Sequence, residues 1–228
     1  MQSSFYIDKI VKKPWGEEHI CYHDKKKIGI TFVKINPGFQ TSLHCHPTKK
    51  TGFVILSGAA NVQIGLYEKN IINYKPLSIL VLRPGLFHQI RCASKKPLYA
   101  LETETPFKKN DLVRFDDNYG RKAKSYENQK ELISIISSKY FIFNNNINKE
   151  TKYKFNKIKF KIKTFKTNNS LTKTKNKKKT IAIILDGSLI DQEKRPVIKH
   201  GEIVKFSSIL LLSKFYKIRN KLKLLIIN

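Results

Sequence analysis

Residues 38–58 read Gly38-Phe-Gln-Thr-Ser-Leu-His44-Cys-His46-Pro-Thr-Lys-Lys-Thr51-Gly-Phe-Val-Ile-Leu-Ser-Gly58. Alternate residues of a strand share a face, so His44 and His46 are expected to point the same way. Two imidazoles on one face can hold a divalent ion when neighbouring strands supply further ligands. Further along the chain a Pro-Gly turn leads into His88, which places a third imidazole at the start of another strand. The sequence therefore predicts one metal site formed by His44, His46 and His88.

Short segments rich in Val, Ile and Phe surround this stretch, and turns containing Gly or Pro separate them. Such segments are typical of β-strands, and many short strands at regular spacing are typical of a sandwich or barrel. The expected strands are residues 28–35, 53–56, 60–66, 77–82 and 98–103. The predicted fold class is therefore all-β.

The frame around the histidines resembles the two motifs of the cupin superfamily. Gly38 lies six residues before His44, Gly58 lies twelve residues after His46, and Pro-Gly-x-x-His88 closes the pattern. The resemblance implies a cupin double-stranded β-barrel, or jelly roll. Two flanking segments resemble a narrower group, the cupin domain of type II mannose-6-phosphate isomerases and mannose-1-phosphate guanylyltransferases. The first is Lys13-Pro-Trp-Gly-Glu-Glu18. The second is Glu102-Thr-Glu104-Thr-Pro together with Asp111-Leu-Val-Arg-Phe-Asp-Asp-Asn-Tyr-Gly-Arg121.

This narrower resemblance covers roughly residues 9–122 and implies an activity. Members of the group interconvert aldose and ketose sugar phosphates, with a divalent metal ion, for nucleotide-sugar and surface-polysaccharide synthesis. The implied cofactor is a divalent ion such as zinc, iron, manganese or nickel, held by the three histidines. The implied ligand is a sugar phosphate or a nucleotide sugar. Its phosphate needs a cation, which Lys49, Arg83 or Arg114 could supply, and Lys49 and Arg114 are the predicted choice.

The chain departs from the pattern of these relatives at three positions. Thr51 stands where the cupin motif has a glutamate ligand, His44 where the isomerases have glutamine, and Lys49 where they have arginine. The missing carboxylate could come from Glu102 or Glu104 on the last strand of the barrel. Two functions stay open: a sugar-phosphate isomerase, and a non-catalytic cupin that binds a sugar or sugar nucleotide.

Three segments are expected along the chain. Residues 1–122 form the cupin barrel, and residues 123–150 form a connector that is partly helical, because the apolar residues between 126 and 136 follow a helical spacing. Residues 151–228 are predicted to be a degenerate cupin-like repeat, so that the chain would be a bicupin. In this register Ala182-Ile-Ile-Leu-Asp-Gly187 corresponds to residues 53–58, and Leu212 takes the place of His88. The repeat has no His-x-His and is expected to bind no metal.

The net charge of +28 comes mostly from lysine. Nucleic acid is one partner for such a chain, but base and phosphate recognition usually depends on arginine. A general excess of lysine in loops is therefore favoured over a nucleic-acid partner as the explanation of the charge.

No apolar run approaches the ~20 residues of a spanning helix, and we expect no membrane span. The N-terminus lacks signal-peptide features, and the three cysteines cannot all pair. The predicted location is the cytoplasm. If the protein forms an oligomer, we expect a homodimer.

Overall fold

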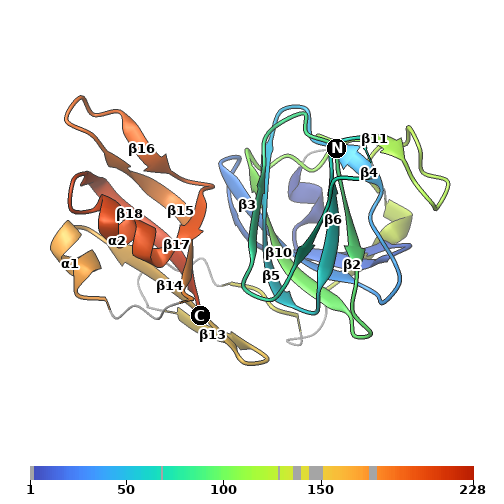
Figure 1. Ribbon diagram of the computed structural model, residues 1–228, viewed down its shortest axis with the longest axis horizontal. Coiled ribbons are helices and arrows are strands. Elements are labelled where there is room, and N and C mark those ends of the chain that lie inside the picture. Colours follow the sequence, from blue (N-terminus) through green and yellow to red (C-terminus); the bar gives the residue numbers. More distant parts are fainter. Residues whose placement is uncertain (1–2, 68, 128, 136–139, 144–150, 175–178) are drawn as a thin grey trace. The chain divides into compact units, whose positions relative to one another are not determined.

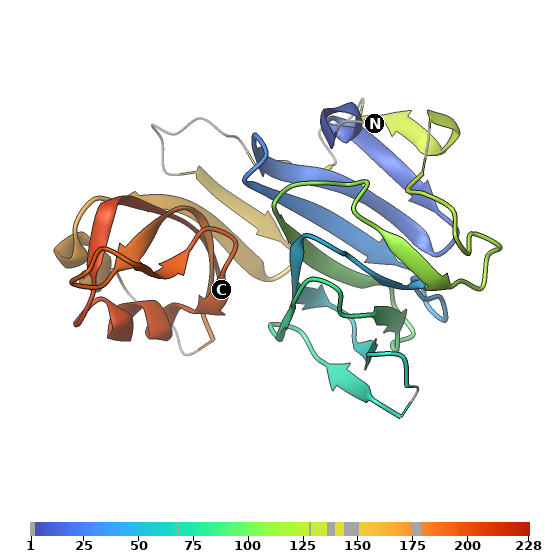
Figure 2. The same cartoon turned by 90° about the horizontal axis from the view of Figure 1, so that it is seen from above.

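The computed structural model describes residues 3–67, 69–127, 129–135, 140–143, 151–174 and 179–228. The chain divides into two compact units, Met1–Ile142 and Phe143–Asn228. Figures 1 and 2 show the first unit in blue to yellow-green and the second in orange to red. Both units are built from antiparallel sheets, which confirms the predicted all-β class. Within the described residues, no helix has the length and apolar character that crossing a membrane requires.

The first unit contains two antiparallel sheets. One has the strand order β12-β1-β2-β3-β10-β5-β8, and the other has the order β11-β4-β9-β6-β7. Its elements are η1 (Ser3–Tyr6), β1 (Lys9–Lys13), β2 (Gly16–Asp24), β3 (Ile28–Ile35), β4 (Leu43–Cys45), β5 (Lys50–Ser57), β6 (Ala60–Ile64), β7 (Ile71–Tyr74), β8 (Ile79–Leu82), β9 (His88–Cys92), β10 (Leu98–Thr105), β11 (Val113–Asp116), η2 (Gln129–Glu131) and β12 (Leu132–Ser134). The strands expected from the sequence are all present, with ends that differ by a few residues.

The core of the first unit joins inward-facing side chains of both sheets. Val33, Phe53 and Ala100 come from the first sheet, and Val62 and Ile90 come from the second. Burial of such apolar side chains contributes roughly 25 cal/mol per Å². Two sheets that face each other across one core are the layers of a jelly roll. The predicted cupin barrel is therefore the fold of this unit.

The connector differs from the expectation of a helix. Residues Leu132–Ser134 form strand β12 and pair antiparallel with β1, with Leu132 opposite Val11 and Ser134 opposite Lys9. A short 3-10 turn, η2, leads into this strand. This strand extends the first sheet. Pairing with β1, and not the local spacing of apolar residues, therefore determines the conformation of residues 132–134. Ile136, which completed the helical pattern, lies outside the described residues.

The second unit contains one six-stranded sheet in the order β13-β14-β18-β15-β16, with β17 paired to β15. Leu171 and Ile209 from two short helices pack on the same face as Ile184, Leu224 and other apolar residues of the sheet. The elements are β13 (Thr151–Phe155), β14 (Ile158–Phe165), α1 (Asn168–Thr172), β15 (Ile181–Ile190), β16 (Pro196–Lys199), β17 (Ile203–Lys205), α2 (Phe206–Leu212) and β18 (Lys217–Ile227).

Strands were predicted for residues 151–228, and the structure has them. The predicted alignment of these strands with those of the first unit does not agree with the structure. Leu212 ends helix α2, whereas His88 begins strand β9, so the register that equated the two is wrong. Gly58 follows strand β5 at a turn, whereas Gly187 lies inside strand β15. A single sheet with helices on one face does not confirm a second cupin-like repeat.

Candidate metal site and ligand cavity

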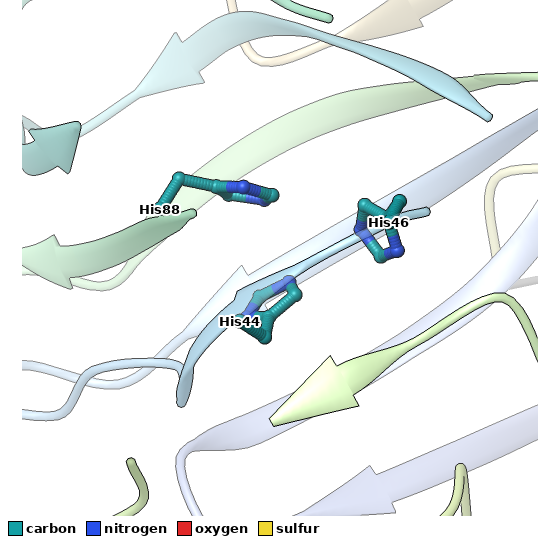
Figure 3. A group of neighbouring side chains, drawn as sticks. All are labelled: His44, His46 and His88. Atoms are coloured by element: carbon teal, nitrogen blue, oxygen red, sulfur yellow. The ribbon is translucent and has the colours of Figure 1, made fainter. Parts of the chain in front are cut away.

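Two short strands bring the three histidines together. His44 on β4 lies directly opposite His88 on β9, and His46 follows two residues after His44, so its side chain lies on the same face. The ring centroids of His44 and His88 are 4.4 Å apart, and that of His46 lies 5.0 Å from His44 and 5.4 Å from His88. Figure 3 shows the three imidazoles turned toward one another. One ring nitrogen from each lies within 4.8 Å of the others.

Backbone carbonyls fix the protonation of all three rings. Nδ1 of His44 donates to the carbonyl of Ser42 (2.7 Å), and Nδ1 of His46 donates to the carbonyl of Asp111 (2.6 Å). Nδ1 of His88 donates to the carbonyl of Leu86 (3.1 Å). Because a carbonyl oxygen can only accept, the proton of each neutral ring lies on Nδ1, and Nε2 keeps a lone pair. A metal-binding histidine usually donates its second nitrogen in this way.

Burial keeps the three imidazoles neutral. It lowers the pKa of His46 to about 2, with Lys49 as the next cause, and it lowers the pKa of His88 to about 4. The pKa of His44 falls well below its ordinary value because of burial and of the neighbouring His88. Nε2 of His46 and Nε2 of His88 are buried and have no hydrogen-bond partner among the described residues. A buried acceptor without a partner is costly, and a metal ion would satisfy both.

Neither Glu102 nor Glu104, the two candidates for a fourth ligand, belongs to this group. In the described part of the chain, only the three histidines form a group that could hold a metal ion. Thr51 stands at the position of the motif glutamate, and its buried hydroxyl has no hydrogen-bond partner among those residues. Glu104 lies directly opposite Thr51 in the pairing of β10 with β5. Its carboxylate forms ion pairs with Lys49 and with Lys109 (3.1 Å). Binding of a metal ion by Glu104 would have to compete with these two ion pairs.

Lys49 lies in the wall of a cavity that also includes His44 and His46. Only 2% of this residue is exposed. Its ammonium group forms an ion pair with Glu104 and donates to the carbonyl of Lys108 at 3.1 Å. Lys49, which was predicted to bind phosphate, is therefore a buried and paired cation. It would have to break its ion pair with Glu104 before it could bind a ligand.

Arg114 lines the same cavity and lies directly opposite His44 in the pairing of β11 with β4. Its Nη1 donates to the carbonyls of Lys124 (2.7 Å) and Ser125, and its Nη2 forms an ion pair with Glu127 at 3.0 Å. Its Nε is buried and has no hydrogen-bond partner among the described residues. These contacts fix the guanidinium group of Arg114, and its Nε–H remains as a donor without a partner among the described residues.

The sequence did not reveal a network of buried charges around the cavity. Lys13 lies 3.8 Å from Glu18 and also pairs with Glu127, and Lys109 lies 3.5 Å from Glu18. Tyr126 donates to Glu18. Except for Lys13 and Glu18, which are five residues apart, the partners lie far apart in the sequence. The available signal in the sequence was the pair of motif segments that contain Lys13, Glu18 and Arg121. Residues of both segments line the cavity of this chain.

A jelly roll with three converging histidines is the architecture of a cupin with a candidate metal site. Residues 2–117 match the family described as Mannose-6-phosphate isomerase C-terminal, and the chain belongs to this family. The resemblance expected from the sequence is confirmed. No curated protein matches the chain.

The solved structures to which the chain is similar share little sequence identity with it. KdgF from Halomonas sp. is 17% identical over 41% of this chain and 82% of that chain, with a TM-score of 0.38. A putative sugar phosphate isomerase from Acidithiobacillus ferrooxidans is 21% identical over 35% and 50%, with a TM-score of 0.32. The capsular polysaccharide assembling protein CapF from Staphylococcus aureus is 16% identical over 47% and 31%, with a TM-score of 0.40. The chain thus spans half or less of the length of the last two.

Proposed function

We propose that this chain is a metal-binding cupin that binds a sugar phosphate and interconverts its aldose and ketose forms, as part of carbohydrate or surface-polysaccharide synthesis. The observation that carries the proposal is the convergence of three neutral imidazoles on a charged cavity that also presents Arg114. Membership of the Mannose-6-phosphate isomerase C-terminal family supports the choice of ligand.

The residues present fit a divalent metal ion. All three Nδ1 atoms are occupied by carbonyls, and the Nε2 atoms of His46 and His88 are buried acceptors without a partner among the described residues. Three imidazoles suit zinc, iron or nickel, and manganese less well because it prefers oxygen ligands. When bound, such an ion would polarise a carbonyl or hydroxyl oxygen of the sugar as a Lewis acid.

Arg114 supports the binding of an anion beside the histidines. Its guanidinium group is fixed by two carbonyls and by Glu127, so it requires little reorganisation to bind a ligand. A donor attached to a charged group forms short, strong hydrogen bonds with phosphate oxygens. The unpartnered Nε of Arg114 is the candidate donor, whereas Lys49 would first have to leave Glu104.

A second function, a non-catalytic cupin that binds a sugar or sugar nucleotide, is favoured by Thr51. The hydroxyl of Thr51 occupies the position of the motif glutamate and cannot replace a carboxylate as an anionic ligand. In this alternative the histidines, the ion and Arg114 would still bind the ligand, but no turnover would follow.

Calorimetric titration of the metal-loaded protein tests the proposed function. The ligands are mannose 6-phosphate, fructose 6-phosphate, a nucleotide sugar and free mannose. We expect the phosphorylated sugars to bind more tightly than free mannose. Arg114→Lys should weaken the phosphorylated ligands by about tenfold and leave free mannose unchanged, because lysine keeps the charge but lacks the Nε donor. Arg91→Lys, at an exposed position on β9, is the matched control. Equal and negligible binding of all four ligands would refute the carbohydrate assignment.

A further inference from the structure

Glu102 lines the cavity, yet it differs from every other carboxylate there. It lies on the same face of β10 as Ala100 and Glu104, directly opposite Phe53 on β5. The ring centroid of Phe53 is 6.2 Å from that of His88. Opposite residues of an antiparallel pair have Cβ atoms roughly 5 Å apart. Glu102 therefore lies beside the ring that contacts the histidine group, without joining that group.

The other buried carboxylates around the cavity each have a cation. Glu104 pairs with Lys49 and Lys109, Glu18 with Lys109, and Glu127 with Arg114. Glu102 is only 9% exposed, and no hydrogen bond or ion pair joins it to another residue in the described part of the chain. Buried carboxylates are almost always paired. An exception of this kind, in a cavity beside a candidate metal site, indicates a group kept available for chemistry.

The surroundings of Glu102 disfavour its charged form. Burial, followed by repulsion from Glu104, raises the pKa of Glu102 to about 7. Lys109 and Lys49 act in the opposite direction, while Glu18 on β2 adds to the rise. The two lysines are partly neutralised by Glu104, so they do not hold Glu102 ionised. A carboxylate that titrates near neutral pH can both accept and return a proton.

We propose that Glu102 is the proton-transfer residue of the aldose–ketose interconversion, a role that rests on the function proposed above. Its carboxylate takes the proton from C2 of the aldose phosphate, and the electron pair of the C2–H bond forms the C1–C2 double bond of an enediolate. The resulting carboxylic acid of Glu102 returns that proton to C1. The hydroxyl proton on O2 passes to O1, so the atoms balance without any oxidant, reductant or co-reactant.

The test compares the full-length wild type with Glu102→Gln, which keeps the size of the side chain but cannot accept a proton. Proton NMR in D2O follows the exchange of the C2 hydrogen of mannose 6-phosphate, and calorimetry follows its binding. We expect Glu102→Gln to lower the exchange rate at least about 100-fold, with metal content and the Kd for mannose 6-phosphate within twofold of wild type. Glu193→Gln, an exposed glutamate of the second unit, should leave all three unchanged.

The outcomes separate this role from the proposed function. If Glu102→Gln exchanges the C2 hydrogen at the wild-type rate, the role of Glu102 is refuted while the proposed function stands. If the wild type binds mannose 6-phosphate but exchanges no hydrogen, the interconversion and the role of Glu102 both fail, and only the binding function remains. If the wild type does not bind, both fail. If Glu102→Gln loses binding and exchange in parallel, Glu102 is a structural residue. Should that variant not fold, the pH profile of the wild type decides. Exchange should fall as pH drops below about 7, where Glu102 becomes protonated, and a flat profile from pH 5 to 9 would refute the role.

Discussion

At the residue scale, the state of each imidazole depends on backbone atoms that the sequence does not reveal. Alternation along a strand predicts that His44 and His46 share a face, and the structure places them so. The tautomers depend on the carbonyls of Ser42, Leu86 and Asp111. The partner of His46 is 65 residues away in the sequence. Local patterns therefore identify the residues of the candidate site but not their protonation.

Lys49 shows the same limit for charges. Lys49, which is close to two histidines in sequence, was predicted to bind phosphate because the phosphate of the implied ligand needs a cation. Its partner Glu104 lies 55 residues further along the chain and meets it only because β10 pairs with β5. Only 2% of Lys49 is exposed, so loss of its charge would leave the buried carboxylate of Glu104 without one of its two cations.

We therefore predict that Lys49→Met destabilises the first unit. Removal of one partner leaves Glu104 buried with only Lys109, which should cost up to about 3 kcal/mol. The double variant Lys49→Met/Glu104→Gln removes both charges and should recover most of this loss. Lys95→Met, at an exposed position, is the control. The measurement is chemical denaturation followed by the fluorescence of the single tryptophan, Trp15, which lies in the core of this unit. Equal stability of Lys49→Met and Lys95→Met would contradict the ion-pair account.

At the scale of the elements, the strands that form the barrel core are the best predicted. Ile28–Ile35 was predicted with the bounds that the structure has, because a run of apolar residues between two turns leaves few alternatives. The prediction failed for β12. The local pattern of apolar residues favoured a helix, but three residues there form an edge strand of the first sheet. It also failed for the register of the second unit, since similar apolar strings occur in β5 and β15 in different surroundings.

Gly187 provides a test of the observed second sheet. It has φ +83°, and a Cβ atom there would lie 1.8 Å from the carbonyl oxygen of Lys221 on β18. Gly38 has φ +80° with nothing near an added Cβ atom. Gly38→Ala should cost about 1–2 kcal/mol from the backbone conformation alone, and Gly187→Ala should cost clearly more because β15 and β18 must separate. Hydrogen exchange of the β15 and β18 amides measures the effect. Unchanged protection in Gly187→Ala would show that this pairing is wrong.

At the scale of the whole molecule, the functional proposals all lie in one unit. The family match ends at residue 117, and the histidines, Glu102 and Arg114 precede that point. The resemblance of motifs was enough to predict this barrel and its family, because turn glycines and histidine spacing are fixed by the fold. The network of buried charges could not be predicted in the same way, because its pairs join strands that are distant in sequence.

We expect His44, His46 and His88 to hold one divalent metal ion, and elemental analysis of the purified protein measures this ion. The full-length protein is purified after separate supply of zinc, iron, manganese and nickel, and the metal is measured per chain. We predict a single bound ion in the wild type and in His200→Ala, whose altered histidine lies outside the site. His46→Ala and His88→Ala should reduce the metal to background while the protein stays folded. A wild type without metal after every supply, or full retention of the ion by both site variants, would contradict the account.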